Sequence, residues 1–214
     1  MSKLFITGIG TDVGKTVVSA IVCEALKADY WKPIQSGNIE GTDRATVKSL
    51  VSNDTSTFHP EVYNLKEPVS PHYAAQLEGV EIDMDKIVLP ETKRPLVIEG
   101  AGGLLVPLNR QHLVADLIVH LEAPTIIVSR NYLGSINHTL LTIEFMRYRN
   151  IAIAGIIFNG QPNPSTEEAI LHFGNIPLLG RIGQEPNLSP QVISRYAESI
   201  KKELNHIIEK DEFI

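Results

Sequence analysis

The chain has 214 residues and a hydrophobic fraction of 43%, which suits one domain with one sizeable core. Its net charge is −6 and its positive residues are scattered, which argues against the basic patch of a nucleic-acid-binding protein. One cysteine, Cys23, excludes an intrachain disulfide framework, and no run approaches the roughly 18 apolar residues that span a membrane, so we expect a cytoplasmic protein without a membrane partner.

Short apolar runs alternate with longer helical patterns along the chain. The predicted strands are Leu4–Thr7, Tyr30–Ile34, Leu96–Glu99, Thr125–Ser129 and Ala154–Phe158. The predicted helices are Lys15–Lys27, Asp43–Val51, Ser135–Arg149, Ser165–Phe173 and Pro190–Ile208. Such alternation is typical of an α/β domain with three layers, a mostly parallel sheet covered by helices on both faces. We expect residues 1–214 to form this single domain.

The segment that joins the first strand to the first helix reads GIGTDVGKT at residues 8–16. Its glycines let successive N–H groups converge on phosphate oxygens, and the helix N-terminus adds a positive dipole. Lys15 should reach the outer phosphates of ATP, and the Thr16 hydroxyl should bind Mg²⁺. The usual first glycine of such a loop is replaced by Ile9, with Gly8 standing one residue earlier. We predict a P-loop NTPase-like fold that contacts the nucleotide through Asp12, Val13, Gly14, Lys15, Thr16 and Val17.

An acidic residue and a second glycine run follow the third predicted strand. Glu99 ends this strand, and Gly102 and Gly103 would let the backbone approach a ligand closely. Carboxylate oxygen is a ligand that Mg²⁺ prefers, so the phosphate loop favours metal binding by Glu99 over a capping or ion-pairing role. Asp43 is a second candidate, although an acid at a helix start by itself more often complements the helix dipole.

Two further polar residues follow the second predicted strand. Lys32 would be unfavourable in a buried strand unless paired, whereas at the carboxyl end of the strand it can face a phosphate or carboxylate. The segment by itself does not decide between this role and that of a solvent-facing lysine. Ser36 has the same ambiguity as a turn residue. Ligands of parallel α/β sheets bind beyond the carboxyl ends of the strands, so all these candidates should share one edge.

Six motifs taken together resemble those of the dethiobiotin synthetase family. They read TGIGTDVGKT at 7–16, KPIQSG at 32–37, EPVSPH at 67–72, EGAGG at 99–103, LGSINH at 133–138 and PLLG at 177–180. They occur in the family's order, and the extra residue in the phosphate loop is also a feature of that family. The phosphate loop alone is shared with many NTPases, but the complete set is specific.

The resemblance implies an ATP-dependent ligase that converts 7,8-diaminopelargonic acid and CO₂ to dethiobiotin, with release of ADP and phosphate. One amine captures CO₂ as a carbamate, the γ-phosphoryl group converts this to a carbamic-phosphoric anhydride, and the second amine closes the ring. By the same resemblance, Lys15 and Lys32 stabilise the phosphoryl group and carbamate. Thr16, Asp43 and Glu99 bind Mg²⁺, and Ser36 contacts the diamine or carbamate end.

The resemblance also implies a homodimer with active sites at the subunit interface. The start of the predicted helix Ser135–Arg149 would bind the substrate carboxylate in the partner's site, although Ser135 is also compatible with a simple N-cap. The residues implied there are Gly134, Ser135, Ile136 and Asn137. The nucleotide contacts implied in addition to the phosphate loop are Glu99, Gly102, Gly103, Asn159, Pro177 and Leu178. Asn159 would read the adenine base, and Glu185 is a further candidate on the ribose side.

Three other functions are compatible with a phosphate loop in this fold. The first is an ATPase switch of the partitioning or division-site type, which typically carries a further lysine where this chain has Gly10. The second is an amide-forming synthetase of the cobyrinic-acid type, whose usual glutaminase domain with a nucleophilic cysteine has no room here. The third is a nucleotide-binding module without catalysis. The combination of Lys32, Asp43 and Glu99 argues against the third.

Overall fold

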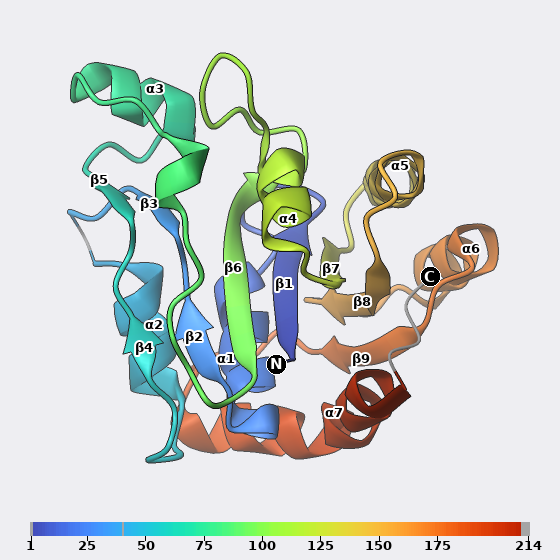
Figure 1. Ribbon diagram of the computed structural model, residues 1–214. Coiled ribbons are helices and arrows are strands. Elements are labelled where there is room, and N and C mark those ends of the chain that lie inside the picture. The colour runs from blue at the N-terminus through green and yellow to red at the C-terminus, as the bar shows by residue number, and fades with distance from the viewer. Residues whose placement is uncertain (1, 40, 211–214) are drawn as a thin grey trace.

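A seven-stranded parallel sheet forms the centre of the computed structural model, which describes residues 2–39 and 41–210 (Figure 1). The strand order is β4-β2-β6-β1-β7-β8-β9. The bounds are Lys3–Gly8 for β1, Asp29–Trp31 for β2, Phe58–His59 for β4, Leu96–Gly103 for β6, Thr125–Arg130 for β7, Ile153–Asn159 for β8 and Leu178–Ile182 for β9. The carboxyl ends of these strands therefore meet along one edge of the sheet.

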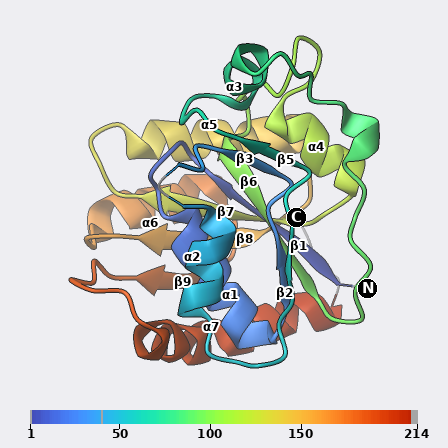
Figure 2. The ribbon, with the colours of Figure 1, turned by 90° about the vertical axis from the view of Figure 1, so that its left-hand side faces the viewer.

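Helices cover both faces of the sheet (Figure 2). One face carries α1 (Lys15–Leu26), α2 (Asp43–Leu50) and α7 (Pro190–Lys210), and the other carries α4 (Val114–Leu121), α5 (Ser135–Tyr148) and α6 (Pro164–Gly174). Successive strand residues alternate between the two layers: Ile6 packs with α1 and α7, while its neighbour Phe5 packs with α4. The three-layer α/β fold predicted from the sequence is confirmed.

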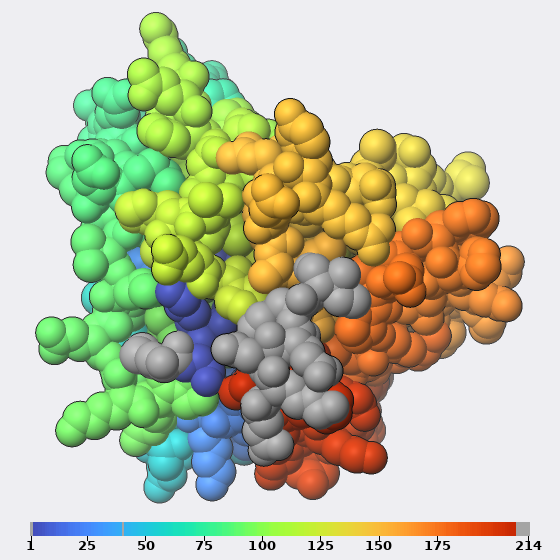
Figure 3. All heavy atoms as spheres, turned by 45° about the vertical axis from the view of Figure 1, so that its right-hand side comes forward, coloured from blue at the N-terminus to red at the C-terminus, as the bar shows by residue number. Residues whose placement is uncertain are grey.

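On the second face, α5 and α6 lie side by side and present a continuous surface (Figure 3). The helix predicted at Ser165–Phe173 is α6, one residue longer at each end.

The final helix α7 runs to Lys210, and the remainder of the chain, residues 211–214, lies outside the described residues. Among the helices of the described residues, none is both long and apolar enough to cross a membrane.

The single strand predicted at Tyr30–Ile34 is wrong, because the chain changes sheets within it. β2 ends at Trp31, and β3 (Ile34–Ser36) pairs instead with β5 (Tyr63–Leu65) in a separate two-stranded sheet. Pro33 lies between the two strands and has no N–H to continue a ladder. Its carbonyl accepts hydrogen bonds from the N–H groups of residues 62 and 63, which starts the second pairing.

Several short elements escaped prediction from the sequence. They are the strands β4, β5 and β9, the helices α3 (Pro71–Leu77) and α4, and a 3₁₀ turn at Met84–Lys86. They contain between two and eight residues each, fewer than the roughly 11 residues over which a helical pattern is recognised. One of them, β9, changes the interpretation of the nucleotide site described below.

Candidate functional site

The phosphate loop joins β1 to α1 and leaves the first turn of α1 open to a ligand. Gly14 stands at the N-cap with φ 95°, and no side chain among the described residues caps this end. The unpaired N–H groups of the first turn are therefore available to an anion. A side chain at Gly8 would lie 2.5 Å from Val13 Cγ2, so the tight turn requires glycine there. The residues predicted to contact the nucleotide here, 12–17, occupy this loop and the first turn.

Lys15 lies over the loop without an acidic partner in the described part of the chain. Its Nζ donates to the Gly10 carbonyl at 3.0 Å, and the residue is only 7% exposed. The pKa of Lys15 is lowered to about 8, chiefly because the residue is buried; Glu99 partly opposes this shift, and the Lys32 ammonium adds to it. A phosphate group in the loop would supply the anion that this buried ammonium lacks.

Replacing Gly14 by alanine should destabilise the loop. An added Cβ would lie 2.0 Å from Asn159 Nδ2, and the φ of 95° is strained for any residue with a side chain. Asn159 Nδ2 would have to move and lose its 2.8 Å hydrogen bond to the Val13 carbonyl. We expect Gly14→Ala to lower the free energy of unfolding by about 2 kcal/mol, measured by urea titration.

Gly10→Ala is the matched control for this prediction. A Cβ at Gly10 would meet nothing within 4 Å, so the stability should change by less than about 0.5 kcal/mol. Equal destabilisation by both substitutions would contradict the steric argument at Gly14.

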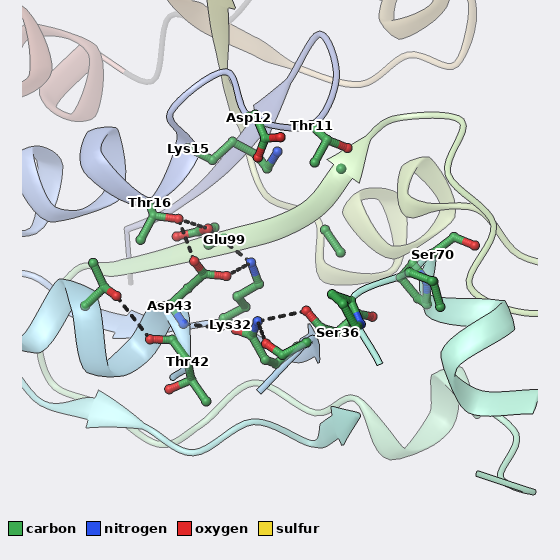
Figure 4. Close-up of a pocket in the computed structure, with 18 of the residues that line it drawn as sticks. Thr11, Asp12, Lys15, Thr16, Lys32, Ser36, Thr42, Asp43, Ser70 and Glu99 are labelled. Carbon is green, nitrogen blue, oxygen red and sulfur yellow. Dashed lines mark hydrogen bonds and ion pairs between the residues drawn. The ribbon is translucent and has the colours of Figure 1, made fainter. Parts of the chain in front are cut away.

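A lysine, two carboxylates and a hydroxyl meet beside the phosphate loop (Figure 4). Thr16 Oγ1 lies 2.9 Å from Asp43 Oδ1 and 2.9 Å from Glu99 Oε1. Lys32 Nζ forms ion pairs with Asp43 Oδ2 and, at 3.1 Å, with Glu99 Oε1. The structure thus brings together four residues that lie far apart in the sequence.

The fold explains how each of these side chains reaches the cluster. In the parallel ladder, Trp31 pairs with Ile98, so the next residues, Lys32 and Glu99, stand opposite each other where β2 ends, whereas β6 continues to Gly103 and does not end at Glu99 as predicted. Asp43 is the first residue of α2, whose N-terminus is capped by the side chain of Thr42. The side chain of Gln35 accepts a hydrogen bond from the Asp43 N–H at 3.1 Å and thereby fixes the start of α2.

The charges in this cluster stabilise one another. Burial opposes the charged form of Lys32, but Glu99 and Asp43 outweigh it and hold the pKa of Lys32 above its ordinary value. Burial also acts against ionised Asp43, yet Lys32 and the hydrogen bonds from Thr16 and Gln35 lower the pKa of Asp43. Lys32 and Asp43 are therefore each held in the charged form.

The donor set at Thr16 fits a hard divalent cation. One hydroxyl proton faces two carboxylate oxygens at equal distance, so it can satisfy only one of them at a time. In the described residues no group of three or more His, Cys, Asp or Glu gathers as a metal cage. Mg²⁺ does not require one, because it is usually held by one or two carboxylates together with substrate phosphates and water.

A cavity of about 1040 Å³ extends from this cluster to β3 and α3. The phosphate loop and Thr16 line one end, and Ser36 and Ser70 line the other. Val106 also lines the cavity. The Ser36 hydroxyl is buried and has no hydrogen-bond partner within the described residues. An unpaired buried hydroxyl that lines a cavity is well placed to meet a polar group of a ligand.

The second glycine run closes this cavity against the phosphate loop. A Cβ at Gly103 would lie 3.2 Å from the Gly8 carbonyl, and Gly102, with φ 67°, lines the cavity. The close approach between the end of β6 and the loop is the reason that small residues are needed there.

The residues predicted to contact the nucleotide base do not all lie together. Asn159 ends β8 beside the phosphate loop, and it pairs with Ile182 in the neighbouring strand β9. Leu178 starts β9 and pairs with Ile156, so Pro177 and Leu178 lie about 10 Å below the edge that carries Asn159. Residues 183–185, which follow β9, reach that edge instead. Because β9 was not predicted, the sequence pattern did not indicate which end of the PLLG motif faces the site.

The predicted substrate residues at the start of α5 lie outside the cavity lining. Gly134, with φ 103°, precedes the helix, and Ser135 is fully buried with its Oγ accepting a hydrogen bond from the Tyr132 N–H at 3.3 Å. Ile136 is 37% exposed, and Leu133 is completely exposed. The Ser135 N–H donates to the Tyr132 carbonyl at 3.0 Å, and no side chain among the described residues caps this helix end.

One residue of the cluster was missed by sequence analysis. The hydroxyl of Tyr30, on β2, donates to Glu99 Oε2 at 2.9 Å. Nothing in the sequence distinguishes this tyrosine from an ordinary core residue, because its partner lies 69 positions away.

Comparisons with known proteins agree with this geometry. A family model described as an AAA domain matches residues 2–192. An ATP-dependent dethiobiotin synthetase of Christiangramia forsetii is 55% identical over 203 residues, which cover 95% of this chain and 98% of the relative. The enzyme of the same name from Cytophaga hutchinsonii is 51% identical and covers 92% of this chain and 96% of the relative.

Two solved structures share the fold at much lower identity. A putative plasmid partition protein from Borrelia burgdorferi bound to AMPPNP has a TM-score of 0.60 and 14% identity, with 97% of this chain and 99% of that chain covered. The MinC:MinD cell division complex of Aquifex aeolicus has a TM-score of 0.59 and 13% identity, with 98% and 96% covered. At such identities the likeness concerns the fold alone.

Proposed function

The chain belongs to the dethiobiotin synthetase family, and from this premise we propose that it joins CO₂ to 7,8-diaminopelargonic acid and closes the ring to dethiobiotin at the expense of ATP. The observation that carries the proposal is the cluster of Lys15, Thr16, Lys32, Asp43 and Glu99 at one end of a cavity whose other end holds Ser36. The two core clusters share one sheet, which supports treating the chain as a single catalytic domain. The single buried Cys23 fits a cytoplasmic enzyme.

ATP would bind with its phosphates on the loop before α1. The N–H groups of residues 12–16 and the helix dipole would face the phosphate oxygens, and the Lys15 ammonium would reach the outer phosphates. This explains why a lysine is kept in an environment that lowers its pKa. The triphosphate supplies the missing negative charge.

Thr16, Asp43 and Glu99 would hold Mg²⁺, directly or through water. When bound there, the ion would neutralise charge that develops on the transferred phosphoryl group. In the absence of the ion, Lys32 compensates the same two carboxylates. We therefore propose that the Lys32 ammonium becomes available to the carbamate and the γ-phosphoryl group as the carboxylates engage the metal.

The diamine would lie in the part of the cavity between Lys32 and Ser36. The unpaired Ser36 hydroxyl would meet the carbamate or an amine, and it would orient that group toward the phosphoryl donor. The second amine would then attack the activated carbamate and expel phosphate. This reaction needs positioning and cations around a developing charge, and the cluster supplies both.

The base would lie at the edge of the sheet between β8 and β9. Asn159 Nδ2 already donates to the Val13 carbonyl, which leaves its Oδ1 to accept a hydrogen bond from an amino group of a base. Because residues 183–185 share this edge, we propose that they contact the base in place of Pro177 and Leu178. The cavity formed by Gln161, Gln184 and Glu185, with two neighbouring prolines, lies at the same edge.

We further propose that two copies of the chain share their active sites. The open N-terminus of α5 would bind the substrate carboxylate in the partner's site through residues Gly134–Asn137. Three apolar side chains around it are exposed, Tyr132, Leu133 and Ile136, and burial of such a group in an interface is favourable.

A mixture of two inactive variants should test the shared site. Lys32→Met removes the cation of one subunit's cluster, and Asn137→Asp places a negative charge where the partner's substrate carboxylate would bind. In a heterodimer one of the two sites contains neither substitution, so random mixing should restore about a quarter of the wild-type turnover. Each variant by itself should remain inactive in the same assay. No recovery on mixing, with dimers present by sedimentation, would show that each site is built from one subunit.

A direct assay tests the function itself. The purified protein is incubated with 7,8-diaminopelargonic acid, bicarbonate and MgATP, and dethiobiotin and ADP are measured together. We expect equal amounts of the two products. ADP formation without dethiobiotin would favour an ATPase switch, the class suggested by the fold alone.

A further inference from the structure

Tyr30 is a completely buried tyrosine whose hydroxyl reaches the charged cluster. It has no exposed surface, and within the described residues its hydroxyl forms one hydrogen bond, to Glu99 Oε2 at 2.9 Å. Glu99 is 1% exposed, so the bond is shielded from water. None of the roles proposed above uses this hydroxyl.

The register of the sheet places the two residues together. Tyr30 pairs with Val97 in the parallel ladder between β2 and β6, and Glu99 lies two residues beyond Val97 on the same face. Such diagonal neighbours are within reach of long side chains. The tyrosine ring lies in the core layer under α1, at 6.4 Å from the ring of Phe58.

The two oxygens of Glu99 have different partners. Oε2 accepts from Tyr30, while Oε1 faces both Thr16 Oγ1 and Lys32 Nζ. The carboxylate is therefore held with one oxygen turned into the core and the other turned toward the proposed metal position. Rotation of the carboxylate would break all three contacts.

We propose that Tyr30 is a positioning residue for metal binding, because its hydroxyl holds Glu99 so that Oε1 is presented beside Thr16. The inference rests on the proposed function in that it assigns the metal site to Thr16, Asp43 and Glu99. Hydrogen bonds to the outer side of a ligating carboxylate orient it, and their loss commonly weakens metal binding by 10-fold or more. Burial raises the pKa of Tyr30 well above its ordinary value, so the hydroxyl remains a neutral donor at physiological pH.

If Tyr30 had only a structural role, its ring would be needed but its hydroxyl would not. The ring fills core space next to Phe58, and phenylalanine would fill it equally well. Only the hydroxyl distinguishes the two side chains, and within the described residues its one partner is Glu99. Tyr30→Phe therefore removes the positioning contact while it keeps the packing.

The test measures metal affinity without requiring turnover. Mn²⁺ is titrated into the protein saturated with ADP, and free Mn²⁺ is followed by electron paramagnetic resonance. We expect Tyr30→Phe to weaken Mn²⁺ binding about 10-fold, with the affinity for ADP in the absence of metal unchanged. Tyr63→Phe is the control, because it also loses a hydroxyl with hydrogen bonds, in this case to the backbone of Asp83, away from the cluster. It should bind Mn²⁺ as the wild type does.

A double-mutant cycle shows whether the effect passes through Glu99. In a Glu99→Gln background, adding Tyr30→Phe should change the Mn²⁺ affinity by less than twofold. An unchanged affinity in the single variant Tyr30→Phe, or an equal further loss in the Glu99→Gln background, would overturn the proposal. Because the readout is metal binding, failure of dethiobiotin formation in the wild type would be recognised separately.

Discussion

Lys32→Met is expected to lower the rate of dethiobiotin formation by two to three orders of magnitude. Removal of one group that stabilises developing charge in a shielded site typically costs about 10²- to 10³-fold in turnover. Lys32 is 6% exposed and contacts both carboxylates of the cluster, so no other described side chain can replace its charge at this position. Steady-state measurement of dethiobiotin formation at saturating MgATP and diamine gives the effect on kcat.

The same variant should also be less stable than the wild type when no metal is bound. Without the lysine, Asp43 and the buried Glu99 lose their cation, and breaking a buried ion pair in this way costs about 3 kcal/mol. Mg²⁺ should therefore raise the melting temperature of Lys32→Met more than that of the wild type. Lys48→Met, at an exposed position on α2, is the control and should alter neither quantity. Near-normal turnover of Lys32→Met would refute the catalytic role.

Lys15→Met is expected to reduce turnover by a similar factor, but with the opposite consequence for stability. Lys15 is proposed to bind the outer phosphates, so its loss should weaken ATP binding as well as lower kcat. In the unloaded protein, however, burial disfavours its charge and lowers its pKa to about 8. Removing the ammonium should therefore leave the free energy of unfolding equal to that of the wild type or slightly higher.

Nucleotide titrations and urea unfolding on the same preparation separate these effects. Binding of ATP is followed by calorimetry, and the unfolding free energy is measured without ligand. A strongly destabilised Lys15→Met protein would indicate that the lysine is part of the folded scaffold, contrary to the role proposed for it. An unaltered ATP affinity of Lys15→Met would show that Lys15 does not bind the phosphates.

Most of the architecture follows from local sequence patterns. The buried strands and long helices have clear apolar periodicity, and the phosphate loop is recognisable because its glycines and lysine are contiguous. The edge elements were missed because two to eight residues contain too little pattern. The segment at 30–34 was wrongly joined into one strand because the effect of Pro33 depends on a partner strand that lies 30 residues later.

Site residues that belong to a sequence motif could be predicted. A residue whose role arises from a contact in the folded protein could not. Lys32 and Glu99 lie within motifs, Asp43 was assigned through the family resemblance, and the register of β2 with β6 brings Lys32 and Glu99 together. Tyr30 could not be found in this way, because its importance arises from a diagonal neighbour on another strand. The location of Pro177 and Leu178 likewise depends on the direction and register of β9, which the sequence pattern did not reveal.

The cavity beside the phosphate loop carries no excess of positive charge. Lys15 and Lys32 contribute two positive charges to its lining, and Asp12, Asp43 and Glu99 contribute three negative charges, in a protein whose net charge is −6. Such a site exerts little long-range attraction on a polyanion approaching from solution. Nucleotide capture should then depend only weakly on ionic strength, and selection would take place at contact, by the loop amides and the shape of the cavity. The enzyme would therefore bind nucleotide without long-range electrostatic attraction. In return, the ion pairs of Lys32 stabilise the folded site when no ligand is bound.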